Sequence, residues 1–181
     1  MIERSIRRDV FAALVDGIVS QQISGKAAAT VWDRLQSLCA EITPERIHAI
    51  DIERIQKCGM SMRKAQYIKS AADAVQSGAL ELSALCDMPD DEVIEQLSAL
   101  PGIGVWTAEM LLIFSLGRKD VLSFGDLAIR RGLCKLYGHK ELTKEQFLRY
   151  KKRYSPFGSI ASLYLWEIST QDQSFSSKPL E

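Results

Sequence analysis

The segment Leu100-Pro101-Gly102-Ile103-Gly104-Val105-Trp106-Thr107-Ala108 joins a tight turn to the start of an apolar helix. Pro101 fixes its own φ, while Gly102 and Gly104 can adopt positive φ and leave room for a neighbouring backbone. The residues from Val105 to Leu116 contain no helix breaker and predict a mostly buried helix. Such a turn directs backbone N–H groups outward at a helix N-terminus, which is an anion site suited to a nucleic-acid phosphate. The alternative is a glycine-rich corner between two helices that binds nothing.

A second feature is an acidic residue at the start of the next predicted helix. Gly125-Asp126 precedes an amphipathic pattern that begins at Leu127 and is closed by Gly138. This pattern predicts that Asp126 is the N-cap of that helix. An isolated Asp in such a place usually serves only as a cap. Its position about two dozen residues beyond the hairpin makes Asp126 a candidate for chemistry as well.

The remaining sequence predicts more helices and no strand. No segment shows the alternating pattern or the turn dipeptides of a β-hairpin, so the chain is predicted to be all-α. Ser24, Thr43, Ser61 and Thr143 are predicted N-caps. Further helical segments are predicted over 10–20, 25–38, 44–58, 61–77, 89–99, 144–153 and 159–169.

The charge of the chain is balanced overall but unevenly distributed. The 181 residues have a formal net charge of zero, so composition alone does not indicate nucleic acid. Residues 118–153, however, contain eleven Lys or Arg and four Asp or Glu, whereas residues 81–99 contain six acids and no Lys or Arg. The basic stretch predicts a phosphate-facing surface. Ordinary solvated helix faces are the alternative.

Cysteine and histidine usage argues against a metal site. The four cysteines are scattered without a C-x-x-C pair, which predicts neither zinc nor disulfides and fits a reducing cytosol. His48 and His139 have no partners at ligand spacing. A charged N-terminus argues against a signal peptide, and no apolar run is long enough to span a membrane.

Taken together, L-P-G-I-G-x-W-T-A and V-L-S-F-G-D-L-A-I-R-R resemble the helix-hairpin-helix (HhH-GPD) DNA glycosylase superfamily, and within it the 3-methyladenine DNA glycosylase II (alkylpurine) branch. The resemblance runs from roughly Phe11 to Trp166. It implies an all-α fold of two helical lobes with the active-site cleft between them. It also implies one domain over 1–181, in which middle helices at about 30–125 carry the hairpin at 100–104. The N- and C-terminal helices would form the second lobe.

The resemblance implies a monofunctional DNA glycosylase of base excision repair. Such an enzyme hydrolyses the N-glycosidic bond of flipped-out alkylated purines of the 3-methyladenine and 7-methylguanine type. Bifunctional relatives use a lysine that forms a Schiff base at the position of Trp106, and Trp cannot do this. No Cys follows Cys134, so the iron–sulfur loop of other relatives is not expected. A monovalent cation at the hairpin would be typical of the family.

The resemblance also implies roles for individual residues. Asp126 would be the catalytic carboxylate that stabilises an oxocarbenium-like transition state. Trp106 and Trp166 would stack on the extruded base, whose positive charge suits electron-rich rings. Phe124 and Met110 would complete the base pocket. Core packing is the alternative for both tryptophans.

The expected partner is double-stranded DNA that contains damaged bases, bound by a monomer without membrane contact in a bacterial cytoplasm, at the nucleoid. Gln22 matches the position whose side chain fills the hole left by the extruded base. The other expected DNA-binding residues are Gly102, Ile103, Gly104, Thr107, Arg63 and Lys64. Two rival functions are a non-catalytic helix-hairpin-helix DNA-binding module and a glycosylase for mismatched or oxidised bases.

Overall fold

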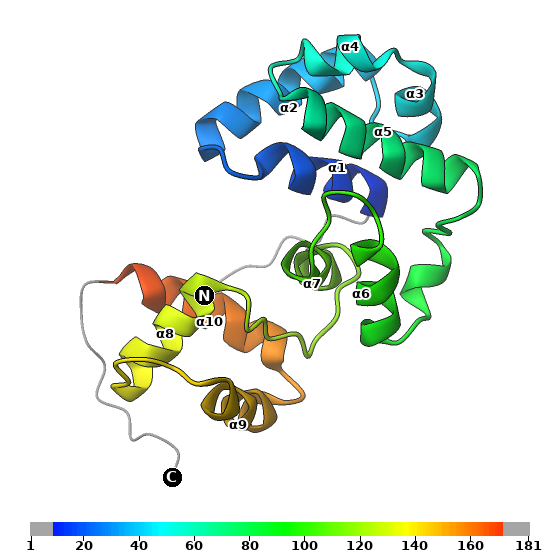
Figure 1. The fold of residues 1–181 in the computed structure, drawn as a ribbon. Coiled ribbons are helices and arrows are strands. Elements are labelled where there is room, and N and C mark those ends of the chain that lie inside the picture. Colours follow the sequence, from blue (N-terminus) through cyan, green and yellow to red (C-terminus); the bar gives the residue numbers. More distant parts are fainter. Residues whose placement is uncertain (1–8, 172–181) are drawn as a thin grey trace. The chain divides into compact units, whose positions relative to one another are not determined.

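The computed structural model describes residues 9–171, and this part of the chain is helical without a β-strand, which confirms the prediction of an all-α fold. Figure 1 shows the order of the elements along the chain. The helices are α1 (Val10–Ser20), α2 (Gly25–Cys39), α3 (Pro44–Ala49), α4 (Ile52–Gln56), α5 (Met62–Gln76), the 3₁₀ helix η1 (Ala84–Cys86), α6 (Asp90–Ser98), α7 (Val105–Phe114), α8 (Leu127–Tyr137), α9 (Lys144–Tyr154) and α10 (Gly158–Thr170).

Most helices begin where their capping residues predict. Ser24, Thr43 and Ser61 each accept a hydrogen bond from the backbone N–H three residues later. Thr143 and Gln146 form a reciprocal capping box at the start of α9. These bonds satisfy N–H groups that have no partner within the first helical turn. The predicted N-caps are therefore confirmed.

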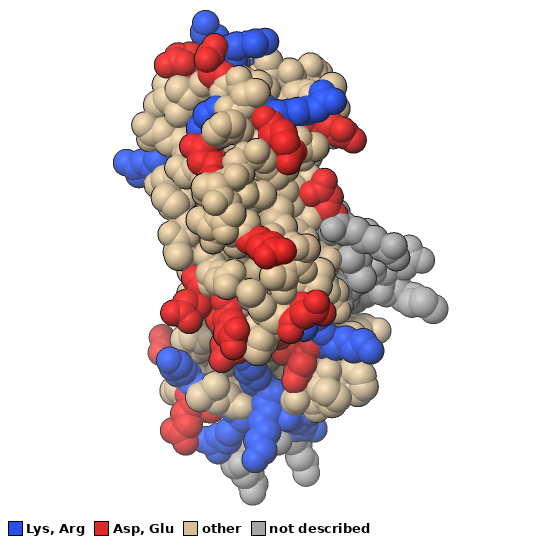
Figure 2. All heavy atoms as spheres, turned by 90° about the vertical axis from the view of Figure 1, so that its right-hand side faces the viewer, with Lys and Arg blue, Asp and Glu red and all other residues tan. Residues whose placement is uncertain are grey.

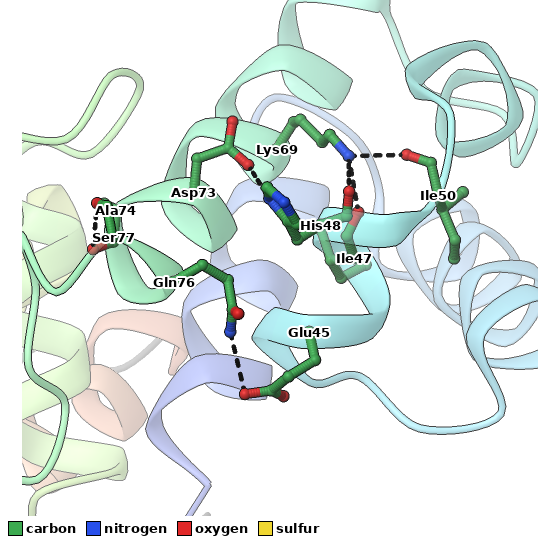
Figure 3. Close-up of polar contacts among 9 residues, drawn as sticks. All are labelled: Glu45, Ile47, His48, Ile50, Lys69, Asp73, Ala74, Gln76 and Ser77. Atoms are coloured by element: carbon green, nitrogen blue, oxygen red, sulfur yellow. Dashed lines mark hydrogen bonds and ion pairs between the residues drawn. The ribbon is translucent and has the colours of Figure 1, made fainter.

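The segment over 44–58 forms two short helices rather than the single one predicted from its apolar stripe. The break falls at Ile50, whose backbone is extended with φ −87° and ψ 137°. Lys69 of α5 donates its Nζ to the carbonyls of Ile47 at 3.2 Å and Ile50 at 2.9 Å, and also to the carbonyl of His48 (Figure 3). The ammonium satisfies carbonyls left unpaired where α3 ends, so a contact distant in sequence terminates the helix.

Residues 9–171 divide into two compact units, a first one over 9–111 and a second one over 112–171. In the first unit α1 packs against α2 and α5, and α5 also contacts α3 and α4. The helix α1 belongs to the first unit, and its buried face includes Phe11 and Leu14. The lobes implied by the family resemblance, with the N- and C-terminal helices together and the middle helices at about 30–125, remain a prediction. The single-domain assignment remains a prediction.

In the second unit, α8 and α10 lie in close contact, and α10 also contacts α9. Gly132 permits the approach, because a Cβ at this position would lie 2.3 Å from the backbone oxygen of Leu165. The buried core of this unit is formed by Leu122, Ile129, Leu133, Tyr137, Phe147, Tyr150 and Leu165. Within residues 9–171, no helix combines the length and apolar character needed to cross a membrane.

Candidate active site and nucleic-acid interface

Asp126 is the N-cap of α8, as predicted, and is only 6% exposed. Its Oδ1 accepts hydrogen bonds from the backbone N–H groups of Ala128 at 2.8 Å and Ile129 at 2.9 Å. Two fixed donors on one oxygen set the orientation of the carboxylate. A preorganised charge in a largely dry setting can stabilise positive charge that develops on a substrate.

The segment that leads to Asp126 is attached to the start of α10. Ser159 donates its Oγ to the carbonyl of Arg118 at 2.7 Å and accepts the N–H of Val121 at 3.0 Å. Ser162 donates its Oγ to the carbonyl of Val121 at 2.9 Å. Both serines are fully buried, and their bonds satisfy backbone groups of an irregular segment. The approach to Asp126 is thereby attached to α10.

Phe124 and Trp166, two predicted pocket residues, are half-buried and already have aromatic neighbours. Phe124 meets Phe147 edge-on with the ring centroids 5.1 Å apart, and the Arg130 guanidinium lies 5.2 Å from the Phe124 centroid. Trp166 stacks on Phe114 at 5.6 Å. The rings are held by packing and still expose part of their surface, which is what a stacking surface for a base requires.

In the hairpin turn between α6 and α7, one of the two glycines has the positive φ that the sequence allows. Gly102 has φ +82°, and a Cβ there would lie 2.0 Å from the ring of Tyr67. Ile103 donates its N–H to the carbonyl of Leu100 at 3.1 Å, which closes the turn. Gly104 does not have a positive φ, but open space surrounds the position of its missing Cβ. Gly104 is thus where another backbone can approach.

The predicted residues around the hairpin differ in exposure. Ile103 and Thr107 are buried, and Thr107 Cγ2 lies 3.4 Å from the position that a Cβ on Gly17 would take. Their side chains therefore serve packing within the first unit. Trp106 is 46% exposed and Met110 is half-buried. Of these side chains, that of Trp106 offers the largest accessible face.

The loop after α1 carries Gln22, which is exposed and has φ +56°. Gln21 donates its Nε2 to the carbonyl of Gly102 at 2.8 Å, which ties the loop to the hairpin turn. Of the two basic residues predicted to bind DNA, Arg63 is exposed, and Lys64 donates its Nζ to the carbonyls of Val19 at 2.7 Å and Gln21 at 2.6 Å. Burial lowers the pKa of the Lys64 ammonium.

Some basic residues of the stretch at 118–153 contact other residues of the second unit. Lys135 donates its Nζ to the carbonyl of Ser169 at 2.8 Å, and Arg149 lies 3.7 Å from Glu145. The three consecutive basic residues at 151–153 are exposed on α9. Figure 2 shows Lys and Arg side chains gathered in the lower part of the view, with acidic side chains beside them. The exposed part of the basic stretch is the part available to phosphates.

Several residues that shape the candidate site were not predicted. Tyr67, Gln21 and the serines of α10 act through contacts 35 to 81 residues away in sequence. No local pattern encodes such pairs. The only available signal was the position of Gln21 beside Gln22. Within residues 9–171, no group of three or more His, Cys, Asp or Glu side chains could hold a metal ion.

Comparison with known proteins gives consistent matches. Residues 15–156 match the family described as HhH-GPD superfamily base excision DNA repair protein. DNA-3-methyladenine glycosylase 1 of Schizosaccharomyces pombe is 37% identical over 168 residues, which cover 90% of this chain and 74% of the relative. The crystal structure of a Bacillus halodurans DNA-3-methyladenine glycosidase aligns with a TM-score of 0.85 and 38% identity over 93% of this chain and 79% of the other. A Schizosaccharomyces pombe 3-methyladenine DNA glycosylase in complex with abasic DNA aligns with a TM-score of 0.82 and 36% identity, over 98% and 88% of the two chains.

Proposed function

We propose that this chain, which belongs to the HhH-GPD superfamily of base excision DNA repair proteins, is a monofunctional DNA glycosylase that releases alkylated purines from duplex DNA. The observation that carries the proposal is the setting of Asp126. Its carboxylate is buried, and two backbone N–H groups orient it at the start of α8.

The proposed reaction breaks the bond between the base nitrogen and C1′ of the sugar. The bonding electrons leave with the base, which becomes neutral because alkylation had made it cationic. Positive charge grows on the sugar, and Asp126 stabilises it, an effect worth on the order of several kcal/mol in a dry site. A water oxygen then bonds to C1′, and its proton passes to Asp126. The products are the free base and an abasic site in an uncut strand.

Aromatic side chains are proposed to recognise the extruded base. Trp106 presents an exposed indole, and Trp166 is half-buried against Phe114. A ring with high electron density attracts a cationic purine more than a neutral one. Trp106 also occupies the position at which a Schiff-base lysine would stand, which supports hydrolysis by water.

The hairpin and the loop after α1 are proposed to hold the DNA. The backbone at Gly104 is open to a phosphate, Arg63 supplies an exposed charge, and Gln22 would enter the duplex. A monovalent cation at the hairpin would be held by carbonyls such as those of Leu100 and Gly102. Each accepts one hydrogen bond and keeps a second lone pair. There the ion would add positive charge facing a phosphate.

The protein would act as a monomer. It would work in a reducing compartment that holds the chromosome, as a bacterial cytoplasm does, because all four cysteines are free thiols.

The test compares wild type with Asp126→Asn in base release from methylated duplex DNA and in DNA binding. Asn remains a good N-cap, so the folded protein is retained while the charge is removed. We expect release of 7-methylguanine and 3-methyladenine by wild type. We expect the variant to bind DNA and to lose release by at least about a hundredfold, the scale of one lost electrostatic group.

Other outcomes would assign a different function or exclude Asp126 as the catalytic residue. Binding without release by wild type, on both methylated and other damaged duplexes, would indicate a DNA-binding module. Release only from mismatched or oxidised duplexes would indicate a glycosylase of another specificity. Unimpaired release by Asp126→Asn would remove Asp126 from the chemistry.

A further inference from the structure

The loop between α1 and α2 presents two exposed side chains, Gln22 and the 40%-exposed Ile23. Gln22 has φ +56°, a left-handed backbone conformation that few residues other than glycine adopt. Such a conformation persists only when the surrounding structure imposes it. The loop is therefore held in this shape by contacts outside itself, and those contacts determine where the Gln22 side chain points.

Two side chains supply these contacts on the N-terminal flank of Gln22. The Gln21 amide donates to the carbonyl of Gly102, 81 residues away in the hairpin turn. The Lys64 ammonium, from α5, donates to the carbonyls of Val19 and Gln21. Those carbonyls lie at the end of α1, where no further helical turn provides a donor. The backbone just before Gln22 is thereby attached to both the hairpin and α5.

We propose that Gln21 and Lys64 are positioning residues that hold Gln22 in the conformation in which its side chain enters the DNA. The proposal rests on the proposed function and goes beyond it. It assigns Lys64 to the loop rather than to a DNA phosphate. It also couples the hairpin turn to the inserting loop through the hydrogen bond of Gln21 to Gly102.

The geometry around Lys64 favours this role over a phosphate contact. An ammonium has three N–H donors, and carbonyls at 2.7 and 2.6 Å occupy two of them. A phosphate would have to share the ammonium with these two short bonds and would have to reach it in a half-buried setting. A lysine that contacts a phosphate also has a measurable signature, because each such contact contributes about 0.9 to the slope of log affinity against log salt concentration.

The chain contains a matched control for a purely structural lysine. Lys69 lies on the same helix, five residues after Lys64, and makes the same kind of contact with the carbonyls of Ile47, His48 and Ile50 at the end of α3 (Figure 3). It has no bond to the loop at 20–24 among the contacts of the described residues. Any effect that comes only from the loss of a helix cap should therefore be equal in Lys64→Met and Lys69→Met.

The experiment uses the full chain and a duplex with a tetrahydrofuran abasic analogue opposite 2-aminopurine. The fluorescence of 2-aminopurine rises when the base loses its stacking, and the assay needs no base release. The proteins are wild type, Gln22→Ala, Lys64→Met, Lys69→Met and Gln21→Ala, each also tested for thermal unfolding. Binding is titrated at several salt concentrations. Lys64→Met is repeated in the Gln22→Ala background.

We expect Gln22→Ala to abolish most of the fluorescence rise, and Lys64→Met to reduce it by at least about half with a salt slope within about 0.3 of wild type. Lys69→Met should keep the fluorescence rise of wild type, even where its unfolding temperature falls as much as that of Lys64→Met. In the Gln22→Ala background, Lys64→Met should have no further effect, because residues that act through one another are not additive. Where Lys64→Met fails to fold, Gln21→Ala should show the same loss of fluorescence.

A slope lower by about 0.9 in Lys64→Met would identify a phosphate contact and overturn the proposal. So would an unchanged fluorescence rise in Gln21→Ala, an equal loss in Lys69→Met, or a normal rise in Gln22→Ala. Failure of the proposed function is a separate result. It appears as absence of base release by wild type, whereas this assay reports only on the loop.

Discussion

The ring of Tyr67 occupies the space that a side chain at Gly102 would need, with a Cβ there placed 2.0 Å from Tyr67 Cδ2. The φ of +82° at Gly102 independently disfavours any other residue. Tyr67 and Lys64 both lie on α5. One helix therefore supports the hairpin turn through the tyrosine and the loop at 20–24 through the lysine.

Replacement of Gly102 by Ala should destabilise the protein and weaken DNA binding. The new methyl group would displace Tyr67, and the left-handed backbone adds a strain of about 1–3 kcal/mol. Urea unfolding measures the loss. Gly104→Ala is the matched control, because its φ is not positive and nothing lies within 4 Å of its Cβ position. Equal losses of stability in the two variants would contradict the packing described for Tyr67.

Replacement of Gly132 by Ala should lower the free energy of unfolding through overpacking between α8 and α10. A Cβ at this position would lie 2.3 Å from the Leu165 carbonyl oxygen, and backbone cannot move aside as a flexible side chain can. The expected cost is about 1–3 kcal/mol. Gly25→Ala, at the start of α2 with open space around it, should be neutral or stabilising. A neutral Gly132→Ala would show that the two helices separate at little cost.

Local rules predicted most of the helices, because caps such as Ser61 and Thr143 act within three residues. They failed over 44–58, where Lys69, far along the chain, terminates α3. A continuous apolar stripe carries no sign of such a contact. The family motif likewise placed Asp126 and the hairpin in the correct elements.

Lys64 shows a limit of motif reasoning for the site. A lysine near a DNA-binding loop predicts a phosphate contact, but the motif gives no sign that its ammonium also donates to two carbonyls at the end of α1. The exposure of a side chain likewise cannot be read from the motif. Ile103 belongs to the hairpin motif and is nevertheless buried, whereas Trp106 three residues later is accessible.

Asp126→Ala should cost stability that Asp126→Asn retains. The carboxylate oxygen accepts two N–H bonds at the start of α8, and Asn can still accept while Ala cannot. The difference between the two variants should be about 1 kcal/mol in chemical denaturation, the usual value of an N-cap. Both should lack base release. If Ala were as stable as Asn, the cap would not contribute to folding and the Asp would be there for chemistry alone.

Trp106→Leu should reduce base release far more than stability. The side chain is 46% exposed, and leucine can keep apolar contact at the buried part but cannot attract a cationic purine. We expect a fall of about tenfold or more in the single-turnover release of 7-methylguanine, equivalent to about 1.4 kcal/mol. Trp106→Phe should restore part of the rate because it keeps an aromatic face. A rate for Leu equal to that of Phe would exclude stacking as the role of this position.

Tyr154 should make the stability of the protein fall at alkaline pH. Burial, followed by the hydrogen bond with the Tyr137 hydroxyl at 2.9 Å, raises the pKa of Tyr154 well above its ordinary value of 10.0. The folded state therefore keeps a proton that the unfolded state loses near pH 10. Its contribution is complete below that pH and declines above it, by up to about 1.4 kcal/mol per pH unit. Urea unfolding between pH 8 and 11 should show a shallower decline for Tyr154→Phe. Tyr164→Phe, at an exposed position, should behave as wild type. An identical decline in all three proteins would assign the alkaline loss to other groups.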